Sequence, residues 1–208
     1  MDKIIRVLDI LLSLSILLVI SPLFLFLVVW IKFHDKDGPV FYQQTRVGLN
    51  GVDFSLLKFR TMKVGADKSG LITIGDKDPR VSHSGFYLRK YKLDELPQLI
   101  NVLRGEMSLV GPRPEVRKYV NLYTPNQMRV LDVRPGITDY ASIEYMDENE
   151  ILSASSDPDR TYVEEIMPAK IALNMKFVCN RTLAEYFRIL WMTFVKLSGK
   201  IWNYIIGK

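Results

Sequence analysis

Two adjacent carboxylates, Asp94 and Glu95, are the residues of this sequence with the clearest capacity for chemistry. They lie in the stretch from Leu88 to Glu115, where lysines and arginines stand on both sides of them. Carboxylates are ordinarily solvated or paired singly, so two beside several cations suit chemistry on a negatively charged substrate. The flanking basic residues are Arg89, Lys90, Lys92, Arg104 and Arg113.

The sequence around this pair has two interpretations. An acid shortly before Pro97 is an ordinary helix start, because Asp caps a helix, Glu suits the positive end of the dipole and Pro fits the first turn. A helix start is also a place where phosphates bind. A carboxylate kept ionised there is available as a nucleophile or as a magnesium ligand. The local pattern favours capping, and only its surroundings favour chemistry.

Further basic residues stand beside rigid turns elsewhere in the chain. Lys58 and Arg60 are two residues apart and therefore share one face of an expected strand. Arg113 stands between two prolines, which limits backbone freedom and fixes the approach of a guanidinium suited to a pair of phosphate oxygens. Any one of these cations alone is better explained as a solvated surface charge, so their number carries the argument. The candidate anion-binding residues are Lys58, Arg60, Arg80, Arg89 and Arg113.

The composition narrows the partners and cofactors. The 208 residues carry a formal charge of +5, which favours an anionic partner such as a phosphorylated substrate, an anionic lipid or a nucleic acid. An aromatic and basic groove pattern is missing, so nucleic acid is set aside. One cysteine excludes an internal disulfide framework, and only two histidines argue against a zinc site. A metal would be a hard ion held by carboxylate and phosphate oxygens.

The first elements that must position this chemistry are apolar. Residues 10–31 carry no charge and are long enough to cross a bilayer as one straight helix. Two features favour a re-entrant path that enters one leaflet and returns. Pro22 removes a backbone donor near the middle, where the Ser21 hydroxyl could bond a backbone group that the proline frees. Basic residues also flank both ends, whereas a spanning helix concentrates them on its cytoplasmic side. The residues alone leave both paths open.

The body of the chain reads as short elements. Residues 39–42 and 54–59 predict two strands joined by a turn at 48–51, and a helix is expected over 96–104, ending at Gly105. Residues 71–85 read as loop and 134–138 as a turn. Short helices are expected over 114–123 and 125–133, and another begins near Thr161, where Pro168 is expected to divide it from a second helix that runs to about Cys179.

The tail over residues 183–206 is amphipathic. One apolar stripe includes Leu183, Phe187, Leu190 and Phe194, with Trp191 beside it, and charged residues lie opposite. A helix packed on the core would show this pattern. Its aromatic residues and its basic polar face favour a helix lying in the membrane interface.

The chain as a whole resembles the bacterial sugar transferases, the monotopic polyprenyl-phosphate phosphoglycosyl transferases. Six motifs match in order and cover most of the chain together with the Ser21-Pro22 segment and residues 134–138. The motifs are Lys58-Phe59-Arg60-Thr61-Met62, Asp78-Pro79-Arg80-Val81, Leu88-Arg89, residues 93–98, residues 101–108 and Gly111-Pro112-Arg113-Pro114. The length is similar to that of the small, minimal members of the family.

The resemblance implies a reaction at the cytosolic face of the bacterial cytoplasmic (inner) membrane. Family members move a sugar phosphate from a UDP-sugar to undecaprenyl phosphate and release UMP, which begins the assembly of polysaccharide, O-antigen or glycoprotein. By this resemblance Asp94 attacks the β-phosphorus and Glu95 assists by positioning, proton handling or binding Mg²⁺. Both carboxylates are the implied metal ligands, and downstream membrane glycosyltransferases are implied partners. The basic residues named above would neutralise the diphosphate and the lipid phosphate.

The expected architecture is α+β and mostly helical. It has an N-terminal re-entrant membrane helix-hairpin over residues 1–33, broken at Ser21-Pro22, and a compact cytosolic catalytic domain with a short β-hairpin over 34–182. Amphipathic interfacial helix follows over 183–208, so membrane lipids are expected partners.

Two points limit the functional interpretation. Many family members continue the turn at 134–138 with Gly-Leu-Ala, whereas this chain reads Asp139-Tyr140-Ala141, so the identity of the sugar is left open. We expect sugar contacts from residues 63–76 and 144–160. A membrane-anchored scaffold that binds lipid phosphates would explain the basic charge and the apolar segments. It would not explain Asp94 and Glu95, because an anion binder would avoid adjacent carboxylates.

Overall fold

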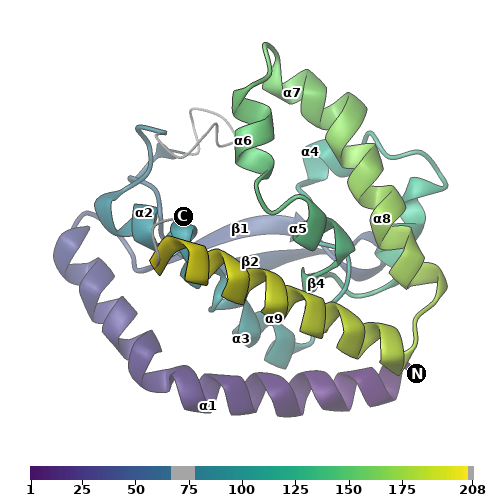
Figure 1. Cartoon of the computed structure of the whole chain (residues 1–208), viewed down its shortest axis with the longest axis horizontal. Helices are drawn as coiled ribbons and strands as arrows, with labels where there is room; N and C mark the ends of the chain where they lie inside the picture. The colour runs from purple at the N-terminus through teal and green to yellow at the C-terminus, as the bar shows by residue number, and fades with distance from the viewer. Residues whose placement is uncertain (67–77, 206–208) are drawn as a thin grey trace.

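The computed structural model describes residues 1–66 and 78–205, which are mostly helical with two small sheets. The longest element is α1 (Asp2–His34), the one described helix that is long and apolar enough to cross a membrane. Figure 1 shows α1 along one edge of the molecule, bent in its second half. The expected N-terminal apolar helix is thereby confirmed.

Pro22 lies inside α1 and removes a hydrogen bond from it. Its missing N–H would have bonded the carbonyl of Leu18, four residues earlier. Ser21 Oγ donates to that same carbonyl at 2.9 Å, which confirms the expected role of the serine. The helix continues through this point without interruption. Its path in a membrane, re-entrant or spanning, stays a prediction.

The first half of α1 is held on the body by polar contacts. Asp9 is 1% exposed, and its Oδ1 accepts from Ser108 Oγ at 3.0 Å, Leu109 N at 2.9 Å and Tyr186 OH at 2.8 Å. Arg6 Nη2 donates to the carbonyl of Leu103 at 2.9 Å. These contacts join α1 to residues that lie 97 to 177 positions further along the chain, so the helix is part of the packed molecule.

The predicted β-hairpin is present. Strands β1 (Phe41–Val47) and β2 (Asp53–Phe59) pair antiparallel, with Phe41 opposite Phe59. The turn contains η1 (Leu49–Gly51), in which Asn50 and Gly51 take positive φ angles of 55° and 75°. The first strand begins two residues later than predicted and extends to Val47, because the pairing continues to the turn.

Between residue 78 and the second sheet, the structure describes three short helical segments: α2 (His83–Lys90), η3 (Leu93–Glu95) and α3 (Gln98–Arg104). The predicted helix over 96–104 is confirmed in α3, which ends at Gly105 with φ 84°. The interpretation of Asp94 and Glu95 as helix caps is wrong. They lie in a separate 3₁₀ turn, and Pro97, which precedes α3, makes no side-chain cap. Residues 71–77 of the expected loop over 71–85 lie outside the described residues, and in the remainder α2 already begins at His83.

A second sheet was not predicted. Strand β3 (Ser108–Val110) pairs in parallel with β4 (Gly136–Thr138), where the sequence suggested only a turn. The two backbones pack closely where Gly111 and Gly136 meet. A Cβ on Gly136 would lie only 2.1 Å from the nitrogen of Gly111, so a residue with a side chain would not fit there. Three-residue strands give too short a pattern for prediction, and the pairing depends on glycines that are 25 residues apart.

The remaining helices before the C-terminal tail are short. They are α4 (Arg117–Val120), η4 (Gln127–Asp132), α5 (Tyr140–Glu144), α6 (Glu148–Ser153), α7 (Pro158–Thr161), the π-helical η5 (Tyr162–Ile166) and α8 (Met167–Cys179). Among them, α8 packs against η4, α5 and η5. The predicted helices over 114–123 and 125–133 are shorter than expected. Pro168 lies in the first turn of α8, where proline is tolerated, and the helical chain runs on through it.

The amphipathic tail forms α9 (Leu183–Ile205), which lies across the front of the hairpin in Figure 1. Its core face is carried by Tyr186 and Ile189, both fully buried. Phe187 and Phe194 of the predicted stripe are instead 47% and 62% exposed, as Trp191 is at 65%. The packed-core interpretation therefore holds for one face, and an aromatic face remains exposed. The membrane-interface role stays a prediction, and the side chains of 201 and 203–205 lie outside those described.

Candidate active site

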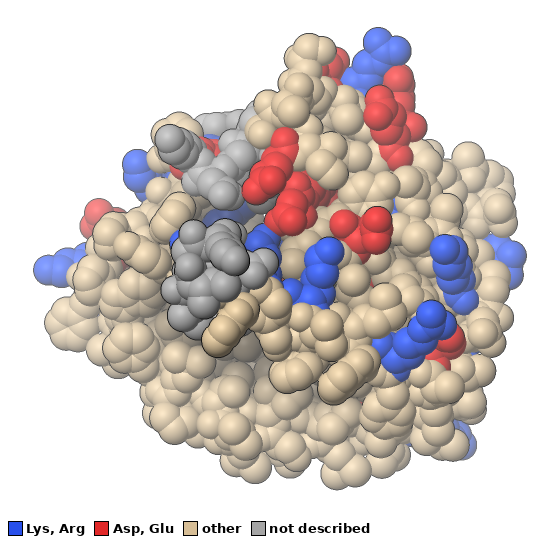
Figure 2. All heavy atoms as spheres, in the orientation of Figure 1, with Lys and Arg blue, Asp and Glu red and all other residues tan. Residues whose placement is uncertain are grey.

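A cleft of about 620 Å³ lies between the β-hairpin and the α5–α6 region, which is within the usual size of a small-molecule site. One side, here called the basic wall, contributes Arg46, Lys58, Arg89, Lys92 and Arg113 around Asp94 and Glu95. The other side, here called the α6 wall, contributes Tyr145, Asp147, Glu148, Glu150 and Lys170. Figure 2 shows acidic side chains gathered where Figure 1 places α6.

Asp94 and Glu95 reach the cleft from the tight turn η3. Lys92, just before this turn, has a left-handed backbone with φ 57°, an uncommon conformation for a residue that is not glycine. Such a conformation costs energy and is maintained by the surrounding packing. It directs the two adjacent carboxylates into the cleft rather than along a helix, which is why neither serves as a cap.

The two carboxylates have different surroundings. Both oxygens of Glu95 accept hydrogen bonds from the Arg113 guanidinium, one of them at 3.1 Å, and Lys58 Nζ lies 3.5 Å from Oε1. Asp94 is 7% exposed, and among the described residues its carboxylate has no hydrogen-bond or ion-pair partner. Glu95 is therefore fixed in place, and Asp94 is available to a ligand.

The pKa values of Asp94 and Glu95 therefore shift in opposite directions. Burial raises the pKa of Asp94, and the neighbouring Glu95 adds to the rise, while Lys58 partly opposes it. Burial would also raise the pKa of Glu95, but Arg113 and Lys58 lower it far below its usual value. Burial lowers the pKa of Lys58, which Glu95 partly restores. Asp94 is thus less readily ionised than its expected place at a helix start implied, and Glu95 is an anion throughout the physiological range.

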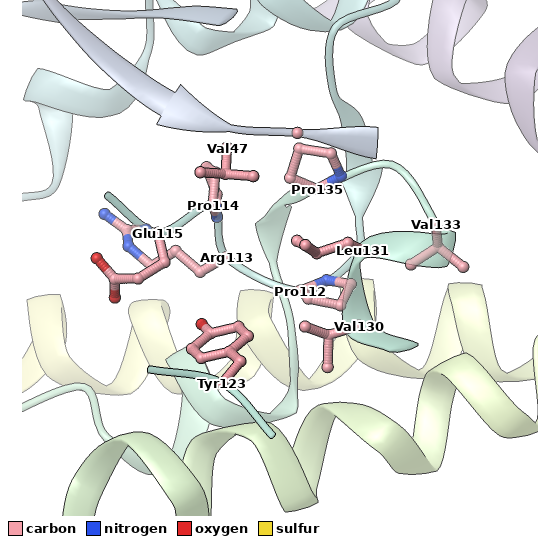
Figure 3. Close-up of a pocket in the computed structure, with 11 residues that line it drawn as sticks. Val47, Pro112, Arg113, Pro114, Glu115, Tyr123, Val130, Leu131, Val133 and Pro135 are labelled. Atoms are coloured by element: carbon pink, nitrogen blue, oxygen red, sulfur yellow. The ribbon is translucent and has the colours of Figure 1, made fainter. Parts of the chain in front are cut away.

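Arg113 is presented by the turn that follows β3. Figure 3 shows this turn from its packed side, where Pro112 lies beside Val130 and Leu131. The gap among these side chains is only about 10 Å³, too small for a ligand. The turn is therefore a closely packed support, from which the Arg113 guanidinium extends to Glu95.

The other predicted cations lie in different environments. Arg89 lines the cleft and lowers the pKa of Asp94, although burial outweighs it. Arg60 also borders the cleft, but its guanidinium donates to the backbone carbonyls of Asp35 and Asp37, the latter at 2.6 Å. Arg80 pairs with Asp78 at 2.6 Å and is outside the residues that line the cleft. The structure thus brings Lys58, Arg89 and Arg113 together, and the substrate-binding roles of all five remain predictions.

Two residues of this region were not predicted from the sequence. Arg46 of β1 lines the cleft and is held by Glu115, 3.1 Å from Oε1. Asp139, after β4, accepts from the backbone N of Arg113 at 2.6 Å. Arg46 had a detectable signal, because Tyr42, Gln44, Arg46 alternate along a strand whose partner carries Lys58. Asp139 had no such signal, because its partner Arg113 follows a different strand, β3.

The donor atoms fit one kind of metal. Among the described residues no group of three or more His, Cys, Asp or Glu side chains converges to form a protein cage. Mg²⁺ requires no such cage, because it keeps several waters and is bound by one or two carboxylates together with substrate phosphates. The oxygens of Asp94, which have no partner in the part of the chain that the structure describes, and the adjacent carboxylate of Glu95 could supply these ligands, and Mg²⁺ remains a proposal.

Comparison with known proteins identifies the family. The chain is 34% identical over 191 residues to the UDP-glucose:undecaprenyl-phosphate glucose-1-phosphate transferase of Caulobacter vibrioides, covering 90% of this chain and 67% of that protein. It is 40% identical over 196 residues to the protein of the same name from Xanthomonas campestris pv. campestris, covering 92% of this chain and 38% of that one.

A third relative is named for a different sugar. The UDP-N-acetylgalactosamine-undecaprenyl-phosphate N-acetylgalactosaminephosphotransferase of Aeromonas hydrophila is 42% identical over 141 residues, or 66% of this chain and 33% of that protein. The chain thus spans between a third and two thirds of the length of these relatives. The family model described as bacterial sugar transferase matches residues 1–200, and the chain belongs to that family.

Proposed function

We propose that this chain is a phosphoglycosyl transferase that moves a sugar-1-phosphate from a UDP-sugar to undecaprenyl phosphate and releases UMP. The names of its relatives support the reaction class. The observation that carries the proposal is Asp94, a buried carboxylate without a described partner that opens into a cleft lined by cations. Such a group suits attack on a phosphorus atom whose charge the surroundings neutralise.

The first step forms a bond between an Asp94 oxygen and the β-phosphorus of the UDP-sugar. The bond from that phosphorus to the oxygen bridging the two phosphates breaks, and UMP leaves with the electron pair. Lys58 and Arg113 neutralise the diphosphate, and Glu95 holds both cations at fixed positions. Mg²⁺, bound by Asp94 and Glu95 with the diphosphate, would neutralise the charge that develops on the leaving phosphate.

The second step transfers the sugar phosphate to the lipid. A phosphate oxygen of undecaprenyl phosphate bonds to the same phosphorus, the acyl-phosphate bond breaks, and Asp94 is regenerated as a carboxylate. The pKa of Asp94 is raised and that of the adjacent Glu95 is lowered. This difference suits the two proposed roles, in which Asp94 reacts and Glu95 remains charged.

The membrane positions the acceptor. Exposed apolar residues lie on α1 and on the aromatic face of α9, where Leu18, Val19, Trp191 and Phe194 are each more than half exposed. We propose that both helices contact the cytosolic leaflet of the bacterial inner membrane, α1 as a re-entrant helix and α9 in the interface. Residues 1–33, 34–182 and 183–208 would then be the membrane, catalytic and interfacial parts.

A single-turnover experiment tests the covalent intermediate. The purified protein is mixed with a UDP-sugar labelled in the sugar and Mg²⁺, without undecaprenyl phosphate. We expect release of up to one equivalent of UMP and label on the peptide that contains Asp94, neither of which Asp94→Asn should give. UMP release that requires the acceptor from the outset would contradict the intermediate and indicate direct transfer.

A labelling experiment tests the topology. Cys179 is the one cysteine, so a Cys179→Ser background allows single cysteines at positions 3 and 36. A re-entrant α1 places both on the cytosolic side, so a membrane-impermeant reagent should label them only after the membrane is opened to it. Labelling of position 3 in intact cells would restore the spanning helix.

A further inference from the structure

Asp139 is a buried carboxylate that joins three parts of the molecule. It is 2% exposed, and its Oδ2 accepts from the backbone N of Arg113 at 2.6 Å and from Asn174 Nδ2 at 3.0 Å. Its Oδ1 caps α5 by accepting from the backbone N of Ser142. One side chain therefore connects the turn after β3 with α5 and α8.

The parallel pairing of β3 and β4 places Asp139 beside that turn. Parallel strands end at the same edge of a sheet, so Arg113, beyond β3, and Asp139, beyond β4, emerge next to each other. The backbone N of Gly111 donates to the carbonyl of Thr138 at 3.0 Å, and that of Gly136 donates to the carbonyl of Pro112 at 3.0 Å. These bonds hold the two segments side by side.

The sequence of the turn makes the contact with Asp139 essential to its position. Pro112 and Pro114 have no backbone N–H, so Arg113 carries the one main-chain donor of this three-residue stretch. Asp139 accepts that donor. On the other side, the Arg113 guanidinium bonds both oxygens of Glu95. The carboxylates of Asp139 and Glu95 therefore hold Arg113 at its backbone and at its side chain.

We propose that Asp139 is a positioning residue for Arg113, which it keeps directed at Glu95 and at the diphosphate. The proposal rests on the proposed function for its effect on catalysis. Asp139 lies behind the turn and contacts no reacting atom, so its influence passes through the placement of Arg113. Because α5 contributes Ala141 and Ser142 to the opposite side of the cleft, the same carboxylate also sets the separation of the two sides.

The substitution Asp139→Ser separates capping from positioning. A serine hydroxyl still caps α5, but it leaves no second oxygen for the backbone N of Arg113. We expect kcat/KM for UMP release to fall by about tenfold to a hundredfold, as for other small displacements of a charge-stabilising group. Asn174→Ala, which keeps the bond between Asp139 and Arg113, should lose much less. Asp132→Ser, which removes the same charge from an exposed position, should behave as wild type.

A double-mutant cycle tests whether the effect passes through Arg113. In an Arg113→Ala background, Asp139→Ser should lower kcat/KM no further, because the group that it positions is gone. Full additivity, or an equal loss in Asn174→Ala, would overturn the proposal in favour of a general structural role. If Asp139→Ser does not fold by circular dichroism, the nearly isosteric Asp139→Asn replaces it in the cycle.

A binding measurement keeps this test distinct from the proposed function. Wild type, Asp139→Ser, Arg113→Ala and the double variant are titrated with UDP and Mg²⁺ by calorimetry. Asp139→Ser should weaken UDP binding only where Arg113 is present. If wild type released no UMP from any UDP-sugar, the proposed function would fail while the binding cycle still decided the role of Asp139. Equal weakening in both backgrounds would overturn that role.

Discussion

The basic wall and the α6 wall hold their charges in different ways. In the basic wall, Lys58, Glu95 and Arg113 form one group whose side chains are 20%, 15% and 33% exposed. In the α6 wall, Glu148 and Asp147 form two separate pairs, with Lys170 and Lys200, and the side chain of Asp147 is 51% exposed. Fixed charges shielded from water stabilise a developing charge more than solvated ones do. We therefore expect the basic wall to set the rate and the α6 wall to adjust selectivity.

The largest effect should come from Asp94, the proposed nucleophile of the basic wall. Asp94→Asn preserves the shape of the side chain but removes the attacking oxygen anion, so we expect kcat for UMP release to fall at least about 10³-fold. Glu95→Gln should retain more activity, since it removes a charge but no bond-forming atom. The assay is UMP release with undecaprenyl phosphate and Mg²⁺. Full turnover in both variants would refute the assignment of either residue.

Removal of the paired arginine should have the next largest effect. Arg113→Ala leaves Glu95 with Lys58 alone and removes a cation from the diphosphate, so kcat/KM should fall by about 10²- to 10³-fold. Combining it with Glu95→Gln should cost less than the sum of the two separate losses, because the residues act as a pair. Strict additivity would show that they do not.

A smaller effect, on selectivity, is expected from the α6 wall. Lys170 pairs with Glu148 at 2.6 Å and lies over the ring of Tyr162, 5.4 Å from its centroid. Lys170→Met keeps the length of the side chain but frees Glu148. We expect the ratio of kcat/KM between UDP-glucose and UDP-N-acetylgalactosamine to change by about tenfold or more, within the range of pocket contacts. A uniform loss for both sugars would assign Lys170 to the rate and so remove the contrast between the walls.

The smallest effect is expected from an ion pair outside the cleft, which serves as a control for both walls. Arg117 of α4 pairs with Asp53, their side chains are 42% and 46% exposed, and neither lines the cleft. Arg117→Ala should change the free energy of unfolding by under about 1 kcal/mol and leave kcat/KM unchanged. Urea denaturation and the UMP assay measure the two quantities. A loss of activity comparable to that of Arg113→Ala would mean that charge alone, rather than position, governs the rate.

Local patterns predicted those parts of the fold that depend on neighbouring residues. The hairpin follows from the turn at 48–51, and α3 follows from apolar spacing and Gly105. The motif that contains Asp94 and Glu95 was found, but their conformation was not. A 3₁₀ turn behind a left-handed Lys92 and a capping turn have similar sequences, and only packing distinguishes them.

Contacts between distant segments could not be predicted. Arg60 lies two residues after Lys58, so it was expected on the same face of the strand. Nothing in the sequence indicates that its guanidinium donates to the backbone carbonyls of Asp35 and Asp37. The sheet of β3 and β4, which places Asp139 against Arg113, depends on two glycines that permit close contact. Such information lies in the three-dimensional pairing, so a single sequence does not display it.

The buried Asp9 has a consequence for how this chain can change over evolution. A helix of equal length and hydropathy that lacked a carboxylate there would deprive Ser108 Oγ, Leu109 N and Tyr186 OH of their shared acceptor. An unsatisfied buried donor costs roughly 1–3 kcal/mol. The apolar helix and the body are therefore not interchangeable modules, and a chimera that exchanges α1 would have to bring its own acceptor at that position.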